Sequence, residues 1–365
     1  MAPFRTWVEI NRSALRHNVG EAKRLASKAG IIAVLKANAY GHGLEEIATT
    51  LADDVAYFAV ASLEEALRLR SVSGKIPIML LSAALPSEYT EIARHGFIPT
   101  ISSYEEALLF SKAAVNRENL FIHFKVDTGM GRLGVWYPEA EKILTKIKNL
   151  PLTVQSISTH LPSADSEVKF TRAQLALFKN LLHTLRRLAP TASVHALNSA
   201  GVLRFSSQQY DLVRVGLMLY GISPLPSFQK MLQPVMTWKA TVSRVTKITK
   251  GSSISYGRTY KAPHDLTVAI LPVGYADGYP RQLSGHGAEV LINGNYCPVL
   301  GIVTMDQIVV DVSRAGRVRS GSVATLLGKQ KKEEITATSL AKKAGTISWH
   351  LFTGITERVH YVYCD

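Results

Sequence analysis

The sequence contains few of the residues and segments that mark metal-binding, disulfide-stabilised or membrane proteins. Only two cysteines, Cys297 and Cys364, occur in the chain; they have neither CxxC spacing nor a histidine at ligand spacing, which predicts free thiols and no metal site. No apolar run approaches the roughly 20 residues that cross a bilayer, and the first residues lack the apolar core of a signal peptide. We therefore expect a cytoplasmic protein without a membrane partner.

Acidic residues are scarce relative to basic ones. Lys and Arg number 42 against 28 Asp and Glu, a net charge of +14, which would suit nucleic acid, an anionic surface or anionic small molecules. The basic residues are scattered, without long blocks and without interleaved aromatic residues. The composition therefore disfavours nucleic acid as a partner.

Short apolar, β-branched runs recur through the first part of the chain, with amphipathic segments between them. The eight runs are IIAVLK from Ile31, AYFAVA from Ala56, IPIMLL from Ile76, FIPTIS from Phe97, LFIHFKVD from Leu120, TVQSISTH from Thr153, SVHALNS from Ser193 and DLVRVG from Asp211. Alternation of strand and helix in this number predicts an α/β fold with a (β/α)8 TIM-type barrel, for which about 250 residues is typical. A doubly wound open sheet is the second interpretation.

The pattern changes after Ser223. A proline-containing linker, SPLPSFQKMLQP, precedes apolar or alternating runs without long helical segments, and Asn293-Gly294 inside one of them predicts a type I′ hairpin. We therefore predict a barrel domain over residues 1–235 and a mostly β C-terminal domain over 236–365. Residues 1–11, which contain the run TWVEI, are expected to pair with the C-terminal domain.

Polar side chains follow several of the predicted strands, at the end of a barrel where reactive groups are found. They are Lys36, Lys125, Asp127, His160, Asn198, Ser199 and Arg214. A lysine beside an apolar strand loses its proton more easily, so it can attack an aldehyde and later act as a base. Ser199 and the turn at Gly216 could present hydroxyl and N–H groups to a phosphate. Lysine with a phosphate site suggests pyridoxal phosphate, although other barrel enzymes combine the same features.

Eight motifs along the chain resemble those of the alanine racemase family. They are, in order along the chain, AVLKANAYGHG, FKVDTGMGRLG, STHLPSAD, HALNSAG, VRVGLMLYG, SYGRTY, LPVGYADGYPR and TMDQ. The resemblance runs from about Trp7 to Tyr363. The resemblance implies a barrel with a β domain, pyridoxal 5′-phosphate as cofactor and a homodimer with shared active sites. It also implies interconversion of L- and D-alanine, which supplies D-alanine for peptidoglycan precursors.

The resemblance assigns the two catalytic bases to Lys36 and Tyr256. Lys36 would hold the cofactor covalently and serve the D enantiomer, and Tyr256, reaching the site of the other subunit, would serve the L enantiomer. Racemisation removes a proton from one face of a planar centre and returns one to the opposite face. Two groups on opposite sides are therefore simpler than one that must migrate.

The resemblance also implies a set of cofactor contacts. Tyr40, Ser199 and the amides of Gly216 and Leu217 would bind the phosphate, Arg214 would face the pyridine nitrogen, and His160 would lie beside the catalytic tyrosine; Asn198, Arg132 and Trp349 complete the set. An arginine does not give up its positive charge to a ring nitrogen. The cofactor would then withdraw electrons weakly, which favours simple return of the proton.

The remaining implied residues concern the substrate. Arg132 and the amide of Met305 would bind the substrate carboxylate, with Lys125, which is commonly carbamylated in the family, orienting Arg132. Asp306 would support the Met305 loop, and Tyr275 would narrow the entrance.

The sequence departs from the family pattern at two places. The common I-P-Y-E near the C-terminus reads Ile347-Ser348-Trp349-His350, so an indole replaces a phosphate-binding phenol. The arginine of G-R-x-x-M-D-Q is Ile302. Both changes bear on cofactor or substrate affinity, and neither alters the two bases.

Three rival functions compete with this interpretation. An amino-acid decarboxylase of similar build would usually place a glutamate at the pyridine nitrogen, where this chain has Arg214. A non-catalytic pyridoxal-phosphate carrier would lack the second domain and have no use for Tyr256. A broad-specificity or serine racemase stays open, because these motifs do not determine the side-chain pocket.

Overall fold

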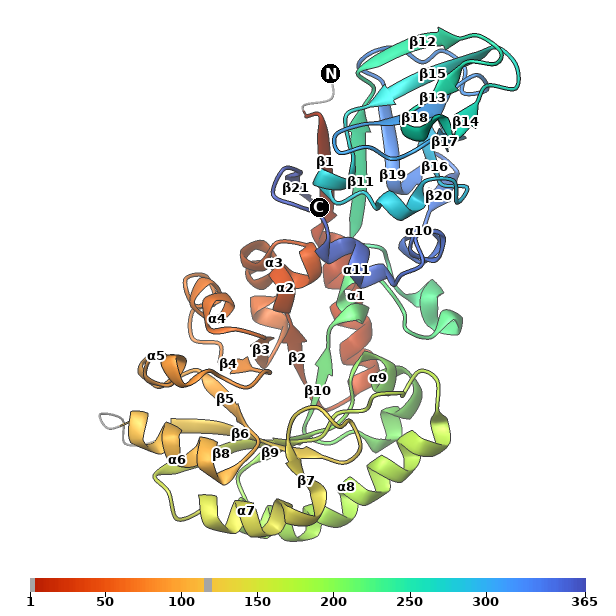
Figure 1. Cartoon of the computed structure of the whole chain (residues 1–365). Helices are drawn as coiled ribbons and strands as arrows, with labels where there is room; N and C mark the ends of the chain where they lie inside the picture. Colours follow the sequence, from red (N-terminus) through yellow and green to blue (C-terminus); the bar gives the residue numbers. More distant parts are fainter. Residues whose placement is uncertain (1–3, 115–119) are drawn as a thin grey trace. The chain divides into compact units, whose positions relative to one another are not determined.

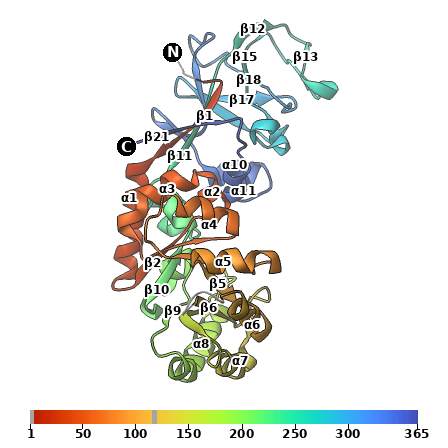
Figure 2. The same ribbon diagram turned by 90° about the vertical axis from the view of Figure 1, so that its left-hand side faces the viewer.

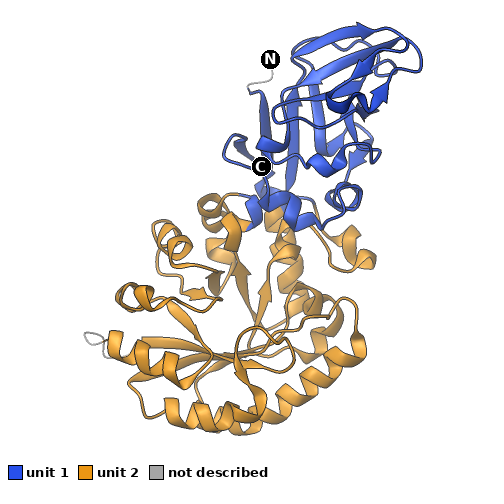
Figure 3. Cartoon of the chain, viewed as in Figure 1, with its two compact units in different colours: residues 1–14, 40–42, 234–365 blue, residues 15–39, 43–233 orange. Residues whose placement is uncertain are grey.

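The computed structural model describes residues 4–114 and 120–365, and it divides into two compact units. One unit comprises residues 15–39 and 43–233, and the other comprises residues 1–14, 40–42 and 234–365 (Figure 3). Residues 1–3, which belong to the segment predicted to pair with the C-terminal domain, lie outside the described residues.

The first unit contains a closed ring of parallel strands. In the described part of the chain the eight strands are β2 (Gly30–Val34), β3 (Tyr57–Val60), β4 (Ile78–Leu80), β5 (Ile98–Ile101), β6 (Leu120–Asp127), β8 (Leu152–Ser158), β9 (Ser193–His195) and β10 (Leu212–Val215). Pairing of β5 with β6 and of β10 with β2 closes the ring. The predicted (β/α)8 barrel is confirmed, with each of the eight apolar runs forming one strand.

Helices lie outside the ring of strands (Figures 1 and 2). They are α1 (Arg12–Ala26), α3 (Leu44–Leu51), α4 (Leu63–Arg70), α5 (Tyr89–His95), α6 (Tyr104–Ala113), α7 (Ala140–Ile147), α8 (Val168–Leu188) and α9 (Ser199–Phe205). In α8 the buried residues Leu175, Phe178, Leu182 and Leu185 recur at intervals of three and four, the spacing of one helix face. No helix in the described residues is both long and apolar enough to span a membrane.

Two of these helices begin with the same local arrangement. Ser62 and Ser103 are the N-cap residues of α4 and α6, and each hydroxyl accepts a hydrogen bond from the backbone N–H of the glutamate three residues later, Glu65 or Glu106. The glutamate side chain in turn accepts from the backbone N–H just before the cap. This reciprocal pairing satisfies helix N–H groups that would otherwise lack partners.

The second unit is built on a largely antiparallel sheet. Its strands run in the order β12 (Arg244–Ile248), β15 (Leu266–Leu271), β18 (Ile308–Asp311), β17 (Asn295–Leu300), β16 (Glu289–Ile292), β19 (Val323–Gln330), β11 (Met236–Thr241), β1 (Thr6–Asn11) and β21 (His360–Cys364), and β20 (Glu333–Ile335) pairs with β19. β1 is antiparallel to β11 and parallel to β21. Both ends of the chain therefore lie in one sheet.

This unit also contains a tight turn, two short helices and a two-stranded sheet of β13 (Ser253–Ile254) and β14 (Tyr260–Lys261). Asn293 and Gly294 have φ of 56° and 78° and connect β16 to β17, which confirms the predicted hairpin because a type I′ turn needs positive φ at both positions. The helices α10 (Ala337–Lys343) and α11 (Ser348–Thr353) were not expected from the pattern of strands. The fold class of a barrel followed by a mostly β domain is otherwise confirmed.

Candidate active site

Lys36 follows β2 by two residues and begins the short segment α2 (Lys36–Gly41). Ala37, Asn38, Ala39 and Tyr40 have φ between 52° and 54°, so this segment is a left-handed helical turn. Residues with a side chain adopt that conformation at a cost of about 1–2 kcal/mol each. Four successive residues in this state indicate strain held in place by the surroundings, as is common at functional sites.

The amine of Lys36 has a lowered pKa. Burial is the main cause and the positive charge of Arg132 adds to it, whereas the carboxylate of Glu65 opposes both. A lysine in this environment provides a neutral amine more readily than an exposed one. The sequence-based expectation of a reactive lysine thus has a physical basis in the folded chain.

Arg214 on β10 is buried and occupies the centre of a polar chain inside the barrel. Its guanidinium donates to the carbonyl oxygens of Thr159 at 2.7 Å and Ala196 at 2.9 Å, and it lies 3.3 Å from Nδ1 of His160. The guanidinium also contacts Nδ1 of a second histidine, His195. Burial lowers the pKa of Arg214 to about 10, so it remains charged near neutrality.

This polar chain continues behind the predicted site. The ring of His195 stacks on that of His123 with centroids 4.8 Å apart, and His123 contacts the hydroxyls of Ser156 at 2.7 Å and Ser158 at 2.8 Å. Sequence reasoning did not single out His123 or His195. Their signal was present, because each lies within a predicted barrel strand where a polar side chain needs a partner.

Arg132 is held by a loop folded around Asp127. One carboxylate oxygen of Asp127 accepts from the N–H groups of Gly129 at 2.8 Å and Met130 at 2.7 Å, and the other accepts from that of Arg132 at 3.1 Å. Asp127 is buried, whereas Arg132 is exposed. Asp127 therefore shapes the loop that carries Arg132, a role that the sequence analysis did not assign; the signal was an aspartate followed by a glycine-containing turn.

Lys125 lies on β6, two residues before Asp127. Burial, followed by the charges of Arg214 and Arg132, lowers the pKa of Lys125 to about 8; Asp127 opposes the shift and Lys36 adds to it. Its amine is therefore partly neutral at mildly alkaline pH. A neutral amine is also the form that reacts with carbon dioxide, which is compatible with the carbamylation implied by the resemblance.

Asn198, Ser199 and Gly216 come together from two neighbouring strand ends. Asn198 caps α9 through the N–H of Gly201 at 2.9 Å, and the hydroxyl of Ser199 accepts from the N–H of Gly216 at 3.1 Å. The amide of Leu217 follows in the same turn. The structure thus brings together three of the groups predicted to bind a phosphate, the hydroxyl of Ser199 and the amides of Gly216 and Leu217.

Tyr40, Gly41 and His42 belong to the second unit. Tyr361 donates to the carbonyl oxygen of Gly41 at 2.9 Å, and Tyr363 donates to that of His42 at 3.3 Å. Gly41 has a φ of 75°, and a Cβ there would overlap the carbonyl oxygen of Phe352. This segment therefore requires glycine, and burial raises the pKa of Tyr40 to about 12, so its phenol keeps its proton.

Tyr256 lies in a turn of the second unit and is 73% exposed. The preceding Ile254 is buried in a cluster with Leu266 and Leu300, and Ser255 donates to the carbonyl oxygen of Ile302 at 2.7 Å. An exposed phenol on a well-packed turn can be presented to another molecule. The family departure at Ile302 lies beside this turn, and its contact there is made by the backbone.

Tyr275, Met305 and Asp306 lie in two loops that are joined to each other. The N–H of Tyr275 donates to the carbonyl oxygen of Thr304, and that of Ala276 donates to that of Met305, both at 3.0 Å. Arg358 pairs with Asp306 at 2.8 Å and with the buried Asp277 at 3.4 Å. Met305 and Tyr275 are exposed, so the joined loops present them outward.

Trp349 lies on α11 and is 39% exposed. It belongs to the second unit, as do Tyr40, Tyr256, Tyr275, Met305 and Asp306, whereas the other predicted site residues belong to the barrel. Of the predicted residues in the second unit, the structure joins Tyr275 to the Met305–Asp306 loop through backbone hydrogen bonds.

The barrel part of the site carries an excess of positive charge. Lys36, Lys125, Arg132 and Arg214 lower the pKa of one another or of His160. The carboxylates acting on them are those of Glu65 and Asp127, and both Asp127 oxygens already accept backbone N–H groups. Such a site is stabilised by an anionic ligand. With a lysine of lowered pKa and a serine hydroxyl beside backbone amides, this donor set fits a phosphate-bearing aldehyde.

The chain is thus a two-unit protein with a (β/α)8 barrel whose strand ends carry a lysine and several cations, a site that suits an anionic ligand. Comparison with known proteins specifies the family. The profile described as alanine racemase, N-terminal domain matches residues 10–224, and that of alanine racemase, C-terminal domain matches residues 235–363. The chain belongs to the alanine racemase family and is an isomerase that interconverts the enantiomers of alanine, as the resemblance implied.

Individual relatives match this chain over nearly its full length. The alanine racemase of Carboxydothermus hydrogenoformans is 41% identical, with 98% of this chain and 99% of that protein aligned. The alanine racemase of Halothermothrix orenii is 39% identical, with 98% and 96% aligned.

Solved structures of alanine racemases also superpose on this chain. Alanine racemase from Bacillus anthracis with bound L-Ala-P superposes with a TM-score of 0.91 at 33% identity, covering 100% of this chain and 96% of that one. Alanine racemase from Bartonella henselae with covalently bound pyridoxal phosphate superposes with a TM-score of 0.90 at 28% identity, covering 99% and 100%.

The buried histidines predict a dependence of stability on pH. Burial first, and then positive neighbours including Arg214, lower the pKa of His123, His160 and His195 well below 6.5. Below that pH the unfolded chain binds protons that the folded chain does not, so stability is present above about pH 6.5 and is lost as pH falls. Each histidine contributes up to about 1.4 kcal/mol per pH unit. The thermal midpoint should therefore fall between about pH 7.5 and about pH 5.5.

A pair of variants separates this effect from general acid sensitivity. His195→Gln should reduce the dependence, whereas His183→Gln, at an exposed position of α8, should leave it unchanged. A midpoint that stays constant over this pH range would contradict the lowered pKa of the three rings.

Proposed function

We propose that this alanine racemase uses pyridoxal 5′-phosphate held on Lys36. The two proton carriers are Lys36 of one subunit and Tyr256 of a second subunit. The enzyme works in the cytoplasm of the cell. The observation that carries the proposal is Lys36 itself. It follows a barrel strand, has a lowered pKa and lies among cations that an anionic cofactor would neutralise. The Bartonella henselae relative with covalently bound pyridoxal phosphate supports the choice of cofactor.

Pyridoxal phosphate, when bound through its aldehyde to an amine, withdraws electrons from the α carbon of an amino acid and makes its hydrogen acidic. Lys36, neutral more readily than an exposed lysine, takes or returns the α proton on one face of the substrate. A second proton carrier is needed on the opposite face, because the product is the mirror image. Tyr256 is proposed for that task.

The exposure of Tyr256 supports a role between subunits. The phenol of Tyr256 is 73% exposed, and its turn is held by Ser255 and by a buried cluster. The side chain therefore adds little to the packing of its own chain and can contact a second subunit. Met305 and Tyr275, which are also exposed, are proposed to reach the same site, where the amide of Met305 binds the substrate carboxylate. Two-fold symmetry would complete two sites in one dimer.

The remaining barrel residues are proposed to bind and orient. Ser199, with the amides of Gly216 and Leu217 and the phenol of Tyr40, holds the phosphate, and Arg132, carried by the Asp127 loop, binds a carboxylate with a charge-assisted hydrogen bond. Arg214, still charged with a pKa of about 10, donates hydrogen bonds without releasing a proton near neutrality. That property favours return of the α proton over other reactions.

Replacing Lys36 tests the proposal directly. Lys36→Ala should lose the visible absorbance that the bound cofactor gives and lower the racemisation rate by several orders of magnitude, because the amine supplies both attachment and proton transfer. Chiral analysis of L-alanine, L-serine and a basic amino acid after incubation measures the activity and its breadth. Lys75→Ala, at an exposed lysine, is the control. Full absorbance and activity in Lys36→Ala would refute the assignment.

Replacing Tyr256 tests the division of labour between the two bases. Tyr256→Phe removes only the hydroxyl, so it should slow removal of the proton from L-alanine more than from D-alanine. Entry of solvent deuterium at the α carbon, measured from each enantiomer, reports the two half-reactions. Tyr296→Phe, another exposed tyrosine of the second unit, should affect neither. An equal loss from both enantiomers would argue against two separate bases.

Mixed dimers test whether sites are shared between subunits. Chains carrying Lys36→Ala and chains carrying Tyr256→Phe, co-expressed in equal amounts, should form dimers in which one site has both lesions and the other has none. Random pairing then restores about a quarter of the wild-type activity, although each variant alone racemises far more slowly than the wild type. Isolated mixed dimers, purified through two different tags, that remain inactive would mean that each site is built from one chain.

A further inference from the structure

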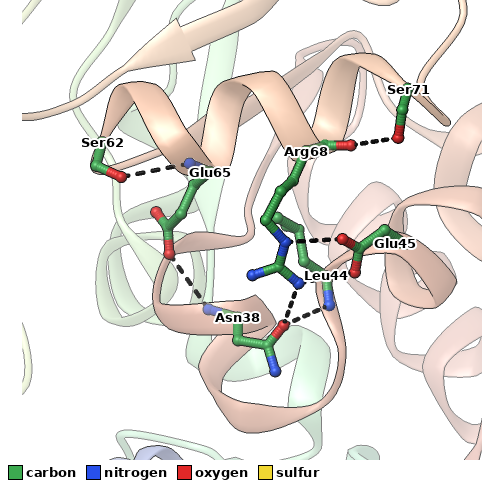
Figure 4. A network of polar contacts seen from close by, with 7 residues as sticks. All are labelled: Asn38, Leu44, Glu45, Ser62, Glu65, Arg68 and Ser71. Atoms are coloured by element: carbon green, nitrogen blue, oxygen red, sulfur yellow. Dashed lines mark hydrogen bonds and ion pairs between the residues drawn. The ribbon is translucent and has the colours of Figure 1, made fainter.

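The left-handed turn after Lys36 is held by a network of polar contacts from the next two helices of the barrel (Figure 4). Within the turn, the N–H of Ala39 donates to the carbonyl oxygen of Leu35 at 2.7 Å, and that of Gly43 donates to that of Asn38 at 3.0 Å. Four successive left-handed residues are nevertheless strained, because residues with a side chain disfavour positive φ. Contacts from outside the turn help to hold it in this conformation.

Asn38 receives those contacts. Its backbone N–H donates to one carboxylate oxygen of Glu65 at 3.3 Å. Its side-chain oxygen accepts from the N–H of Leu44 at 3.0 Å and from the guanidinium of Arg68 at 3.2 Å. Arg68 in turn forms two hydrogen bonds with Glu45, at 2.8 Å and 2.9 Å. Asn38 is thereby connected to both α3 and α4.

Glu65 connects two loops of the barrel. One carboxylate oxygen accepts from Asn38 in the loop after β2, and the other accepts from the N–H of Ala61, after β3, at 2.9 Å. Its N–H is held by the cap residue Ser62 at 3.3 Å, so the position of the side chain is set by the start of α4. The hydrogen bond from Ala61 is an ordinary contact at the start of a helix. The hydrogen bond from Asn38 is not needed to start a helix.

Glu106 provides an internal comparison. It follows Ser103 as Glu65 follows Ser62, and its carboxylate accepts from the N–H of Ser102 at 2.6 Å. The hydrogen bonds described for Glu106 stay within its own loop and helix. The two glutamates therefore share the role at the helix start and differ in the contact to the turn that carries Lys36.

We propose that Glu65 is a positioning residue for the racemase reaction: its carboxylate joins the left-handed turn at Asn38 to the start of α4 and places a negative charge beside the amine of Lys36. The inference rests on the proposed role of Lys36. It identifies the carboxylate that opposes the effect of burial and of Arg132 on Lys36 before any anionic ligand is present.

The electrostatic part of the role follows from the groups that face Lys36. Arg132 lowers the pKa of the Lys36 amine and Glu65 raises it; Lys125 and His160 are the other titratable groups whose pKa depends on Lys36. Glu65 is thus the negative partner in a positive surrounding. Its removal should lower the pKa of Lys36 further.

The experiment compares Glu65→Gln with Glu106→Gln in the full chain. A glutamine can accept through one oxygen only and carries no charge, so both variants weaken a helix start to a similar extent. In Glu65→Gln alone, kcat should fall about 10-fold to 100-fold with little change in KM for alanine, because the amine is misplaced and the substrate contacts remain. A second readout is the pH dependence of acetic anhydride labelling of Lys36 in cofactor-free protein. Its midpoint should move to lower pH in Glu65→Gln and stay unchanged in Glu106→Gln.

Further arms keep the outcomes distinct. Reduction of the wild-type holoenzyme with borohydride, followed by peptide mapping, should find the cofactor on Lys36; attachment to another lysine would defeat the proposed function itself. Attachment to Lys36, with kcat and labelling equal in the two glutamine variants, would overturn only the inference about Glu65. If Glu65→Gln does not fold, Glu65→Asp is measured in its place. Aspartate retains the charge but is too short to reach both N–H groups, so kcat should still fall. Wild-type kcat in Glu65→Asp would overturn the role of the bridge.

Discussion

The mutual repulsion of cationic side chains at the barrel's strand ends is the constraint on which the site depends. Parallel strands that close into a ring deliver their carboxyl ends to one face, and four of the groups delivered there are Lys36, Lys125, Arg132 and Arg214. In a partly buried environment each charge disfavours the others. Burial first and this repulsion second lower the pKa of Lys36, of Lys125 and of His160.

The same constraint explains the polar groups behind the site. A buried guanidinium must have its N–H groups paired, and Arg214 uses the carbonyl oxygens of Thr159 and Ala196 together with His195. His195 can accept from Arg214 only while its ring is neutral. The stack of His195 on His123, held by two serines, continues that neutral chain through the barrel. An arginine that keeps its charge thus depends on histidines that have none.

Much of the fold and part of the site could be predicted from the sequence, because they depend on local patterns. Apolar runs with helical segments between them predict the barrel, and a lysine at the end of a strand predicts reactive chemistry. The left-handed turn after Lys36 could not be predicted, since non-glycine residues such as Ala37 and Ala39 disfavour positive φ and only contacts distant in sequence, including Glu65, impose it. The stacking of His123 on His195 similarly requires the closed ring.

The two departures from the family pattern differ in kind: the contact at Ile302 is made by the backbone, whereas at Trp349 the side chain itself matters. At Ile302 the neighbouring turn is held by the backbone: Ser255 donates to the carbonyl oxygen of Ile302, and Gly301 allows the carbonyl oxygen of Ile254 to lie within 2.7 Å of where a Cβ would be. A change of side chain leaves that contact intact, so Tyr256 keeps its support without the arginine. At Trp349 the side chain itself is the group in question, and no backbone contact can replace a lost phenol. In the proposed site, the second change therefore bears on affinity for the cofactor, since an indole can donate one hydrogen bond but cannot accept one.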